Sequence, residues 1–442
     1  MEAQLFTDQI GRDLRWKKFL RTELGQLYQA FSFSDLEKLF PTTSEKGRPP
    51  LMTIQGGIGL QVLKSYLGLS DAKLIERVNS DWVLQYFCGI KLKEGSWIRD
   101  KDYVGRWRRY IAKHIDYDKF QQTLAVDWKP QMKNTNVVLM DATCYESHLR
   151  YPTDVKLLWE SCEQIWMLID SRCIELQLPK VRRKQKSVRQ AYNNYRKYKR
   201  KPRALTKKIK RRLLHLLQKG IKKWNDLAFK YPLRLRQKTF ELIENIRIVL
   251  FQQQTKFDDP DAKIKNRIVS LYKPYIRPIV RGKEIKRTEF GAKVHSFQVD
   301  GITFIEHLSF DAFNEGIRLT STVDLAESYF DKCKQIGADK IYANNANRKF
   351  CARNGIVTNF VRKGRKPKQP TDADRLREIL GRIRAYSMEG TFGNEKLHYN
   401  LLKIKARTAQ TEKLWICFGI WTASAMKIAR RMNARKSIQK AA

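Results

Sequence analysis

The chain has 442 residues, and its 88 Lys and Arg against 45 Asp and Glu give a formal net charge of +43. A chain of this length exceeds the roughly 250–300 residues that one hydrophobic core serves, so we expect two or three domains. The charge surplus favours a polyanionic partner. The longest uncharged apolar run near the C-terminus, Leu414 to Met426, falls short of the about 20 residues that span a bilayer, so we expect no membrane insertion.

The compartment is indicated by the N-terminus and the cysteines. The first residues mix acidic and basic side chains and lack an apolar signal core, which predicts a cytoplasmic protein. The cysteines are scattered without a CxxC pair, so neither a zinc site nor a disulfide framework is expected. We expect small buried residues in a reducing compartment. The seven positions are Cys88, Cys144, Cys162, Cys173, Cys333, Cys351 and Cys417.

Residues 1 to about 130 are predicted to be helical. Apolar residues recur at helical spacing from Ile54 and stop at Gly68, and Ser70 is a plausible N-cap for a second helix starting at Asp71. Two helices joined by a short Gly-containing turn are typical of a helix-turn-helix and also of an ordinary helical hairpin. This segment taken alone favours the hairpin.

The first strand is predicted where the pattern changes at Asn136. Val137-Val-Leu-Met140 is a short apolar, β-prone run that ends at Asp141, which favours a buried strand with a carboxylate at its C-terminal end. Ligands and chemistry gather beyond the carboxyl ends of strands in open α/β sheets. Asp141 is therefore a candidate site residue.

A strongly basic helical segment follows this strand. Residues 180–223 contain 20 Lys or Arg and no Asp or Glu. Tyr192, Tyr195 and Tyr198 recur there every third residue and are expected to offer stacking surfaces beside the charges. Such a segment would repel itself unless an anion lay against it. Contact with a phosphate backbone is therefore favoured over a merely solvated face, with strongly salt-dependent binding.

The next predicted elements alternate between strands and helices. The runs on either side of Asp300-Gly301 predict a β-hairpin, for which an Asp-Gly pair is a strong signal. A helix is expected at about 321–335. The segment Gly337-Ala-Asp339 is then expected to place a second carboxylate at another strand end.

The C-terminal part is predicted to be mainly helical. A basic loop at 364–370 precedes a long helix from Thr371 to about Phe392, and this helix contains Glu389. The last fifty residues are expected to form a strand or a pair of helices that covers the sheet. The whole order predicts an α/β fold, with a helical domain at 1–130 and a catalytic domain at 131–442 that a basic helical insertion interrupts at about 160–285.

Three acids are candidates for one site. Asp141 and Asp339 lie at predicted strand ends, and Glu389 lies on a predicted helix near a lysine. Most acids in a chain are merely solvated, and the separations (339 − 141 = 198 and 389 − 339 = 50) mean that only the fold can bring these three together.

Several segments resemble the RNase-H-like DDE transposases of bacterial insertion sequences, over most of the chain. The stretch from Asp141 to Leu158 looks like the segment around that family's first catalytic Asp. Asp339-Lys-Ile-Tyr resembles the segment around the second Asp, and Glu389-Gly-Thr-Phe-Gly with Lys396 resembles the segment around the Glu. Further similar motifs are Arg48-Pro-Pro-Leu, Leu67-Gly-Leu-Ser, Asp81-Trp-Val-Leu-Gln-Tyr-Phe-Cys-Gly-Ile, Phe290-Gly-Ala-Lys-Val-His, Asp311-Ala-Phe-Asn-Glu and Asn347-Arg348.

The resemblance implies a fold, an activity and a metal site. The fold is an RNase-H-like mixed-sheet catalytic domain behind a helical DNA-binding domain. The activity is binding of terminal inverted repeats, phosphodiester cleavage and strand transfer. The cofactor is Mg²⁺ or Mn²⁺, as two ions, with Asp141 bridging both, Asp339 on one and Glu389 on the other. Such hard cations prefer carboxylate oxygens, and two of them about 3.5–4 Å apart can clamp the attacking and leaving oxygens.

The resemblance also implies partners and a location. The partner is double-stranded DNA, as transposon ends and as target, bound by a homodimer in a cytoplasmic, nucleoid-associated protein. Lys396, two helical turns beyond Glu389, is expected to hold a phosphate, and a surface lysine is an equally weighted interpretation. The family often carries an Arg four residues before the Glu. Ala385 stands there in this chain, which leaves Arg384 or Arg382 for that role.

Two other functions agree with the same residues. A metal-dependent nuclease of the same fold shares every carboxylate and differs only in lacking strand transfer. A non-catalytic DNA-binding protein would use the basic insertion and the N-terminal helices alone. Acids at strand ends would repel DNA in such a protein, which favours the enzyme.

Overall fold

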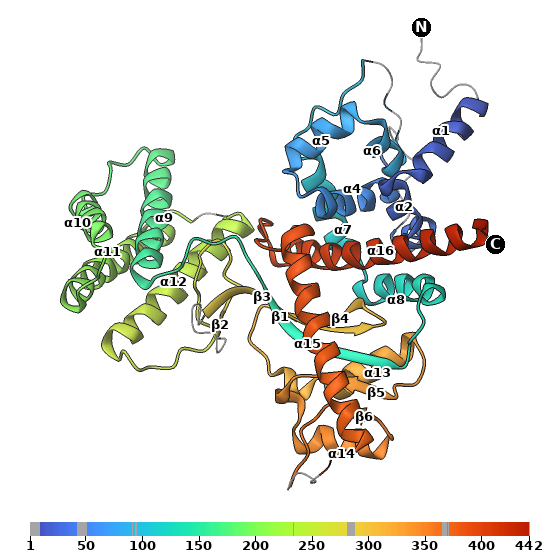
Figure 1. Ribbon diagram of the computed structural model, residues 1–442. Helices are drawn as coiled ribbons and strands as arrows, with labels where there is room; N and C mark the ends of the chain where they lie inside the picture. Colours follow the sequence, from blue (N-terminus) through green and yellow to red (C-terminus); the bar gives the residue numbers. More distant parts are fainter. Residues whose placement is uncertain are drawn as a thin grey trace. The chain divides into compact units, whose positions relative to one another are not determined.

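The computed structural model describes residues 9–41, 51–90, 92, 95–232, 234–280, 288–364, 369 and 371–441 (Figure 1). The Arg48-Pro-Pro-Leu motif, apart from Leu51, and most of the expected basic loop at 364–370 lie outside these residues. The chain forms two compact units. Unit 1 combines Met1–His148, Ala292–Ser309 and Phe313–Ala442, and unit 2 combines Leu149–Gly291 and Phe310–Ala312. The expected insertion at about 160–285 falls within unit 2.

Unit 1 begins with a series of helices, as the sequence predicts. Gly68 ends α4 in the left-handed conformation at φ +64°, and the Ser70 side chain caps α5 by accepting a hydrogen bond from Lys73 N. Both predicted boundaries are confirmed. α4 is buried on nearly all sides, which makes it a core helix. The elements are α1 (Gln9–Arg21), α2 (Glu23–Gln29), α3 (Phe33–Glu37), α4 (Ile54–Leu67), α5 (Asp71–Ser80), α6 (Trp82–Phe87), α7 (Tyr103–His114), α8 (Tyr117–Trp128) and the 3-10 turn η2 (Lys129–Gln131).

The sheet of unit 1 is mixed, in the order β4-β3-β1-β5-β6. β1 pairs with β5 and β5 with β6 in parallel, while β3 and β4 form an antiparallel hairpin. Asp300 and Gly301 turn this hairpin at positive φ, 50° and 74°, which confirms the predicted Asp-Gly turn. The strands are β1 (Val137–Glu146), β3 (Thr288–Val299), β4 (Ile302–Ser309), β5 (Gln335–Gly337) and β6 (Val357–Thr358).

The prediction for the end of β1 is wrong. The strand continues to Glu146, so Asp141 lies in its middle and not at its C-terminal end. The four residues after Asp141 are Ala-Thr-Cys-Tyr, all buried, and the β-branched and aromatic members of this run favour an extended chain. In a sequence, an Asp in the middle of a strand is hard to distinguish from an Asp that follows the last residue of the strand.

The helices after the hairpin differ from prediction at two places. The helix expected at about 321–335 ends at Tyr329, because Gln335 already belongs to β5. The last fifty residues contain one long helix, α16, where a strand or a helix pair was expected. The bounds are η3 (Glu315–Ile317), α13 (Leu319–Tyr329), η4 (Lys340–Tyr342), α14 (Asn345–Arg353), α15 (Asp372–His398) and α16 (Ala409–Ala441).

The N-terminal helices and the sheet share one hydrophobic core. Phe120 on α8 stacks on Trp421 of α16, with ring centroids 4.7 Å apart. The Gln121 side chain donates to Ile305 O of β4 at 2.9 Å, and its oxygen accepts from Ile305 N at 2.8 Å and from Trp421 Nε1 at 3.2 Å. Helices α8 and α16, from distant parts of the chain, therefore cover the hairpin together.

Unit 2 is a helical bundle with its own core. Its helices are α9 (Asp154–Glu175), α10 (Gln185–Lys197), α11 (Arg203–Lys230) and α12 (Gln237–Asp258), and its strand β2 (Pro278–Val280) pairs antiparallel with the start of β3. The expected row of exposed tyrosines is only partly right. Tyr192 is buried and stacks on Trp159 with centroids 5.0 Å apart, Tyr195 is half-buried, and Tyr198 is exposed. Packing against Trp159 takes only Tyr192 inward, and Tyr198 lies just beyond the end of α10.

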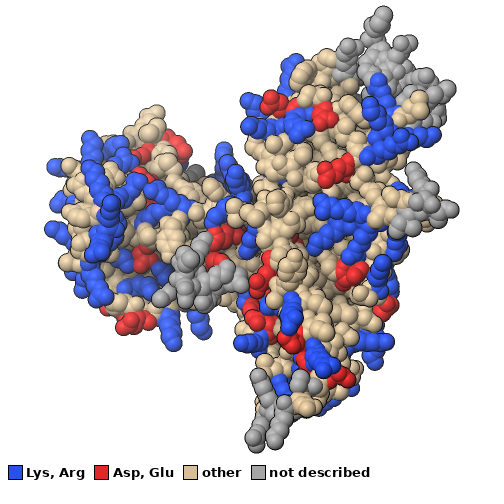
Figure 2. All heavy atoms as spheres, viewed as in Figure 1, with Lys and Arg blue, Asp and Glu red and all other residues tan. Residues whose placement is uncertain are grey.

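Surface charge follows the sequence. Figure 2 shows Lys and Arg side chains crowded over the helices of unit 2. The seven cysteines are all buried, as predicted. Within the described ranges, the structure contains no helix with the length and apolarity to cross a membrane.

Candidate active site

The parallel register of two strands brings Asp141 and Asp339 to the same level of the sheet. β1 pairs with β5 at Val137 with Gln335 and at Leu139 with Gly337. The offset in these pairs, 335 − 137 = 198, equals the separation of the two aspartates, 339 − 141 = 198. The register of the β1–β5 pair therefore accounts for the 198 residues between the two aspartates and sets them side by side.

Local structure holds Asp339 just beyond β5. The preceding Ala338 is fixed from both sides by the Asn359 side chain, which accepts from Ala338 N at 2.9 Å and donates to Ala338 O at 2.8 Å. Asp339 then caps η4 by accepting from Lys340 N at 2.7 Å. The prediction that a carboxylate lies at this strand end is confirmed.

Helix α15 crosses close above the strand pair because of Gly337. A Cβ at this position would lie 2.7 Å from Leu139 Cδ2 and 3.2 Å from Arg384 Cβ, closer than packed atoms normally come. The absence of a side chain therefore lets α15 approach β5. This approach places Arg384 over both aspartates.

Arg384 joins the two aspartates. One guanidinium nitrogen lies 2.5 Å from Asp141 Oδ2 and another lies 4.0 Å from Asp339 Oδ1. The Arg384 and Asp141 side chains are only 12% and 15% exposed, whereas Asp339 is 51% exposed. Burial raises the pKa of Asp141, and the charge of Arg384 opposes this rise. Of the two arginines that the sequence left open, Arg384 is the one at the acids, because Arg382 pairs with Glu378 on the exposed side of the helix.

Glu389 lies on the same helix but on another face. Glu389 is exposed, and it forms no hydrogen bond or ion pair with any other residue that the structure describes. Five residues separate it from Arg384, which is about 140° round an α-helix. The structure therefore brings two of the three candidate acids together and leaves Glu389 apart from them.

Lys396 points back to the sheet. Gly390 and Gly393 do not interrupt α15, so the helix carries Lys396 to β1, where its Nζ donates to Thr143 Oγ1 at 3.0 Å. Thr143 is two residues from Asp141 and so lies on the same face of the strand. Lys396 is half-buried and is not an ordinary surface lysine.

A buried acid next to Lys396 was missed by the sequence. Glu395 is fully buried and accepts a short hydrogen bond from the Tyr145 hydroxyl. Burial raises the pKa of Glu395 to about 7, with the Tyr145 hydrogen bond and the charge of Lys427 opposing the rise. Since Glu395 is one of 45 acids and follows no strand, only its position on the inward face of α15 could have singled it out.

A further acid belongs to the electrostatic surroundings of Asp141. The negative charge of Glu315 contributes to the raised pKa of Asp141, and Glu315 itself forms an ion pair with Lys293. Glu315 ends the Asp311-Ala-Phe-Asn-Glu motif, so the sequence contained a signal for it. Beneath the aspartates, the buried Tyr342 hydroxyl contacts His295 Nε2 at 2.7 Å.

The pair of aspartates suits a cation. A single guanidinium already lies between the two carboxylates, and its Nε is buried with no hydrogen-bond partner among the described residues. Two carboxylates that share one positive charge offer the hard oxygen ligands that Mg²⁺ and Mn²⁺ take. No group of three or more His, Cys, Asp or Glu in the described part of the chain is arranged to hold a metal ion. Asp141 and Asp339 thus fit a metal, and Glu389 does not face them.

Comparison with known proteins adds one match. Residues 9–110 match a family model described as "Transposase domain (DUF772)". The matched segment covers α1 to most of α7 and ends before the sheet begins. No curated protein and no solved structure matches the chain.

Proposed function

We propose that the chain is an insertion-sequence DNA transposase of the DDE class, since residues 9–110 match a family model described as a transposase domain. In this proposal it binds the terminal inverted repeats of its element, cleaves phosphodiester bonds with Mg²⁺ or Mn²⁺, and transfers the cut strand to target DNA. The observation that carries the proposal is the β1–β5 register, which sets Asp141 level with Asp339 under one guanidinium.

The proposed site uses four residues of an RNase-H-like catalytic domain. Asp141 and Asp339 would hold the metal, with Glu389 completing the ligands and Lys396 holding a phosphate. The chemistry supplied there, when two ions are bound, is activation of the attacking oxygen and stabilisation of the leaving oxygen. The parallel strands support this assignment, since they fix the two aspartates on rigid elements.

Arg384 would first hold the two aspartates and, when DNA is bound, contact a phosphate of the substrate. A guanidinium is a planar fork of N–H donors that matches carboxylate and phosphate oxygens equally well. In the structure this fork is used by Asp141 and Asp339. With Asp141 and Asp339 holding a metal, the donors of Arg384 would be available to a phosphate of the DNA.

The first test is cleavage of DNA that carries the element's own ends, with Mg²⁺ or Mn²⁺. Asp141→Asn and Glu389→Gln are each expected to reduce cleavage to the level seen with a chelator. Glu378→Gln is the matched control, because Glu378 is an exposed acid on the same helix whose ion pair among the described residues is with Arg382. Full cleavage by Asp141→Asn would contradict the proposal. Full cleavage by Glu389→Gln alone would remove Glu389 from the ligand set.

Strand transfer and assembly need separate measurements. Pre-cut ends with a 3′-hydroxyl, supplied with a target plasmid, separate a transposase from a nuclease of the same fold, because only the transposase joins them. The proposed homodimer on DNA rests on the family resemblance. Its test is the mass of the complex with end DNA, where one protein chain per complex would contradict it.

A further inference from the structure

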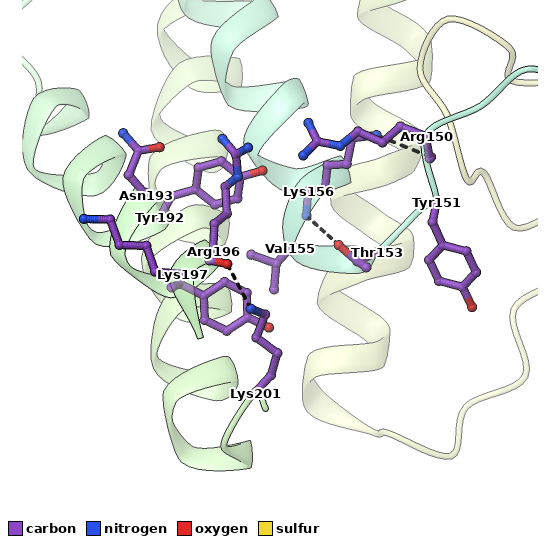
Figure 3. A pocket seen from close by; sticks show the side chains of 11 residues that line it. Arg150, Tyr151, Thr153, Val155, Lys156, Tyr192, Asn193, Arg196, Lys197 and Lys201 are labelled. Atoms are coloured by element: carbon purple, nitrogen blue, oxygen red, sulfur yellow. Dashed lines mark hydrogen bonds between the residues drawn. The ribbon is translucent and has the colours of Figure 1, made fainter. Parts of the chain in front are cut away.

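Unit 2 contains a hollow between the start of α9 and the C-terminal half of α10. It has a volume of about 720 Å³, and every residue that lines it belongs to unit 2. Figure 3 shows that side chains from α10 form one wall, with Arg150 and Lys156 opposite. The hollow, called here the α9–α10 pocket, is lined by Arg150, Lys156, Tyr195, Arg196, Lys197 and Lys201, together with smaller contributions from neighbouring residues.

The α9–α10 pocket carries only positive charge. Five of its lining residues are Lys or Arg, and none of the lining residues is Asp or Glu. Arg150, Arg196 and Lys197 form no ion pair with any acid in the described part of the chain, whereas Lys156 has Glu160 at 3.5 Å. Unpaired cations that face one hollow repel each other, which favours an anion among them.

The acids of unit 2 neutralise other cations. Arg189, three residues before Tyr192 on α10, pairs with Glu163 at 3.0 Å. Arg183 pairs with Asp170 at 2.6 Å, with its side chain only 11% exposed. Arg183 and Arg189 are thus neutralised by acids, whereas Arg150, Arg196 and Lys197 in the pocket have no such partner among the described residues.

Aromatic rings lie beside these cations. The Tyr195 ring lines the pocket, is half-buried, and has Lys201 Nζ 5.1 Å from its centroid. The Arg196 guanidinium lies 5.7 Å from the centroid of Tyr192. The pocket also contains the Asn193 side-chain amide. An inorganic anion needs none of these groups, whereas a nucleotide offers a phosphate for the cations, a flat base for a ring and polar edges for an amide.

We propose that the α9–α10 pocket binds an unpaired nucleotide of single-stranded DNA. The pocket volume lies in the range of about 300–1,000 Å³ that suits a small molecule. A duplex keeps its bases stacked inside, where no pocket reaches them, so a paired nucleotide does not fit this description. The inference rests on the proposed function to the extent that DNA is the substrate, and it adds a preference for unpaired strands at a pocket built from residues of unit 2.

The test is equilibrium binding of the full chain, in chelator, to a fluorescent oligothymidylate and to a duplex of the same length. Arg196→Gln with Lys197→Gln is expected to weaken single-strand binding about tenfold. The slope of log affinity against log salt should fall by about 1.4, at about 0.7 for each lost phosphate contact on a single strand. Duplex binding should change by less than about threefold.

Matched variants distinguish binding in the α9–α10 pocket from a general effect of positive charge. Lys199→Gln with Arg200→Gln removes the same charge from exposed residues of the same segment that do not line the pocket, and is expected to leave single-strand binding within about twofold. Tyr195→Leu should weaken single-strand binding about fivefold to tenfold, since stacking on a ring is lost, while Tyr195→Phe should not. Melting temperatures check that each variant folds.

Several outcomes would overturn the proposal. Equal losses for the two double variants would show a general basic face, and equal losses for single strand and duplex would show backbone contact alone. Unchanged binding by Tyr195→Leu, with inorganic phosphate competing at low concentration, would show a simple anion site. Because this assay contains no metal and measures binding only, whereas the catalytic test measures cleavage by Asp141→Asn, failure of the catalytic proposal and failure of this one remain distinguishable.

Discussion

Replacing Arg384 by Gln should destabilise unit 1 through Asp141. Leaving one member of a buried ion pair without its partner costs about 3–5 kcal/mol when both are fully buried. Arg384 and Asp141 retain 12% and 15% exposure, so we expect about 2–3 kcal/mol in the absence of metal. The contact with the half-exposed Asp339, at 4.0 Å, should add little. At about 2 °C per kcal/mol for a unit of this size, the melting temperature should fall by about 4–6 °C.

The loss should depend on pH in a defined direction. The pKa of Asp141 is raised by burial, so stability is present below its unfolded pKa and is lost as the pH rises through its folded pKa. Arg384 opposes that rise, and its removal moves the folded pKa further up. The difference between Arg384→Gln and the parent chain should therefore be small where Asp141 is protonated in both, and should widen as the pH rises.

Divalent metal should reverse most of this loss. A ligand at one hundred times its Kd stabilises the folded state by about 2.7 kcal/mol, which matches the expected deficit. The parent chain should gain less from Mg²⁺, because Arg384 already occupies the space between the carboxylates. The assay is thermal unfolding at acid and at mildly alkaline pH, with chelator or Mg²⁺.

The control is Arg382→Gln, since Arg382 and its partner Glu378 are 77% and 64% exposed on the same helix. Equal melting temperatures for the two variants would refute the reasoning about the buried pair. Equal Mg²⁺ shifts in Arg384→Gln and the parent would refute the reasoning about a shared cation site.

Two further predictions concern stability alone. Glu395→Gln should remove a pH-dependent loss of folding stability. The parent chain should lose about 3 kcal/mol of unfolding free energy as the pH rises from the ordinary pKa of 4.5 through the raised value of about 7, whereas the variant should not. The same change in stability between pH 5 and pH 8 for both proteins would contradict this. Gly68→Ala should cost about 1 kcal/mol, because the position is left-handed and its surroundings are empty, so only backbone strain is added. Gly390→Ala should instead stabilise by about 0.5–1 kcal/mol, since it lies in a helix with open space, and melting temperatures that move in the same direction would show the backbone argument to be wrong.

Local signals in the sequence were sufficient for many of the boundaries. Gly68 and Ser70 at the α4–α5 turn, and Asp300-Gly301 at the hairpin, each act through their own backbone or side chain, so their effects do not depend on distant contacts. The end of β1 was different. The Ala-Thr-Cys-Tyr run after Asp141 favours an extended chain, but it does not show what partners a carboxylate in mid-strand. That partner is Arg384, 243 residues later in the chain.

The candidate site was predictable as a set of residue types but not as a geometry. The sequence singled out Asp141 and Asp339, and their separation turned out to be the register of one strand pair. It did not indicate Glu395, because burial on the inner face of α15 is decided by how that helix crosses β1. It placed Glu389 with the aspartates by resemblance, whereas the helical rotation of α15 turns its side chain to solvent. That assignment stays a prediction.

The shared core of unit 1 also fixes the order in which the chain can complete its folding. Phe120 on α8 and Trp421 on α16 form a stack, and 421 − 120 = 301 residues separate these two partners. A ribosome adds about 5–20 residues per second, which leaves Phe120 without Trp421 for roughly 15–60 s. During this interval Phe120 has no stacking partner on α16. A transcript cut short near its 3′ end would therefore remove part of the packing of α8 as well as the C-terminal helix.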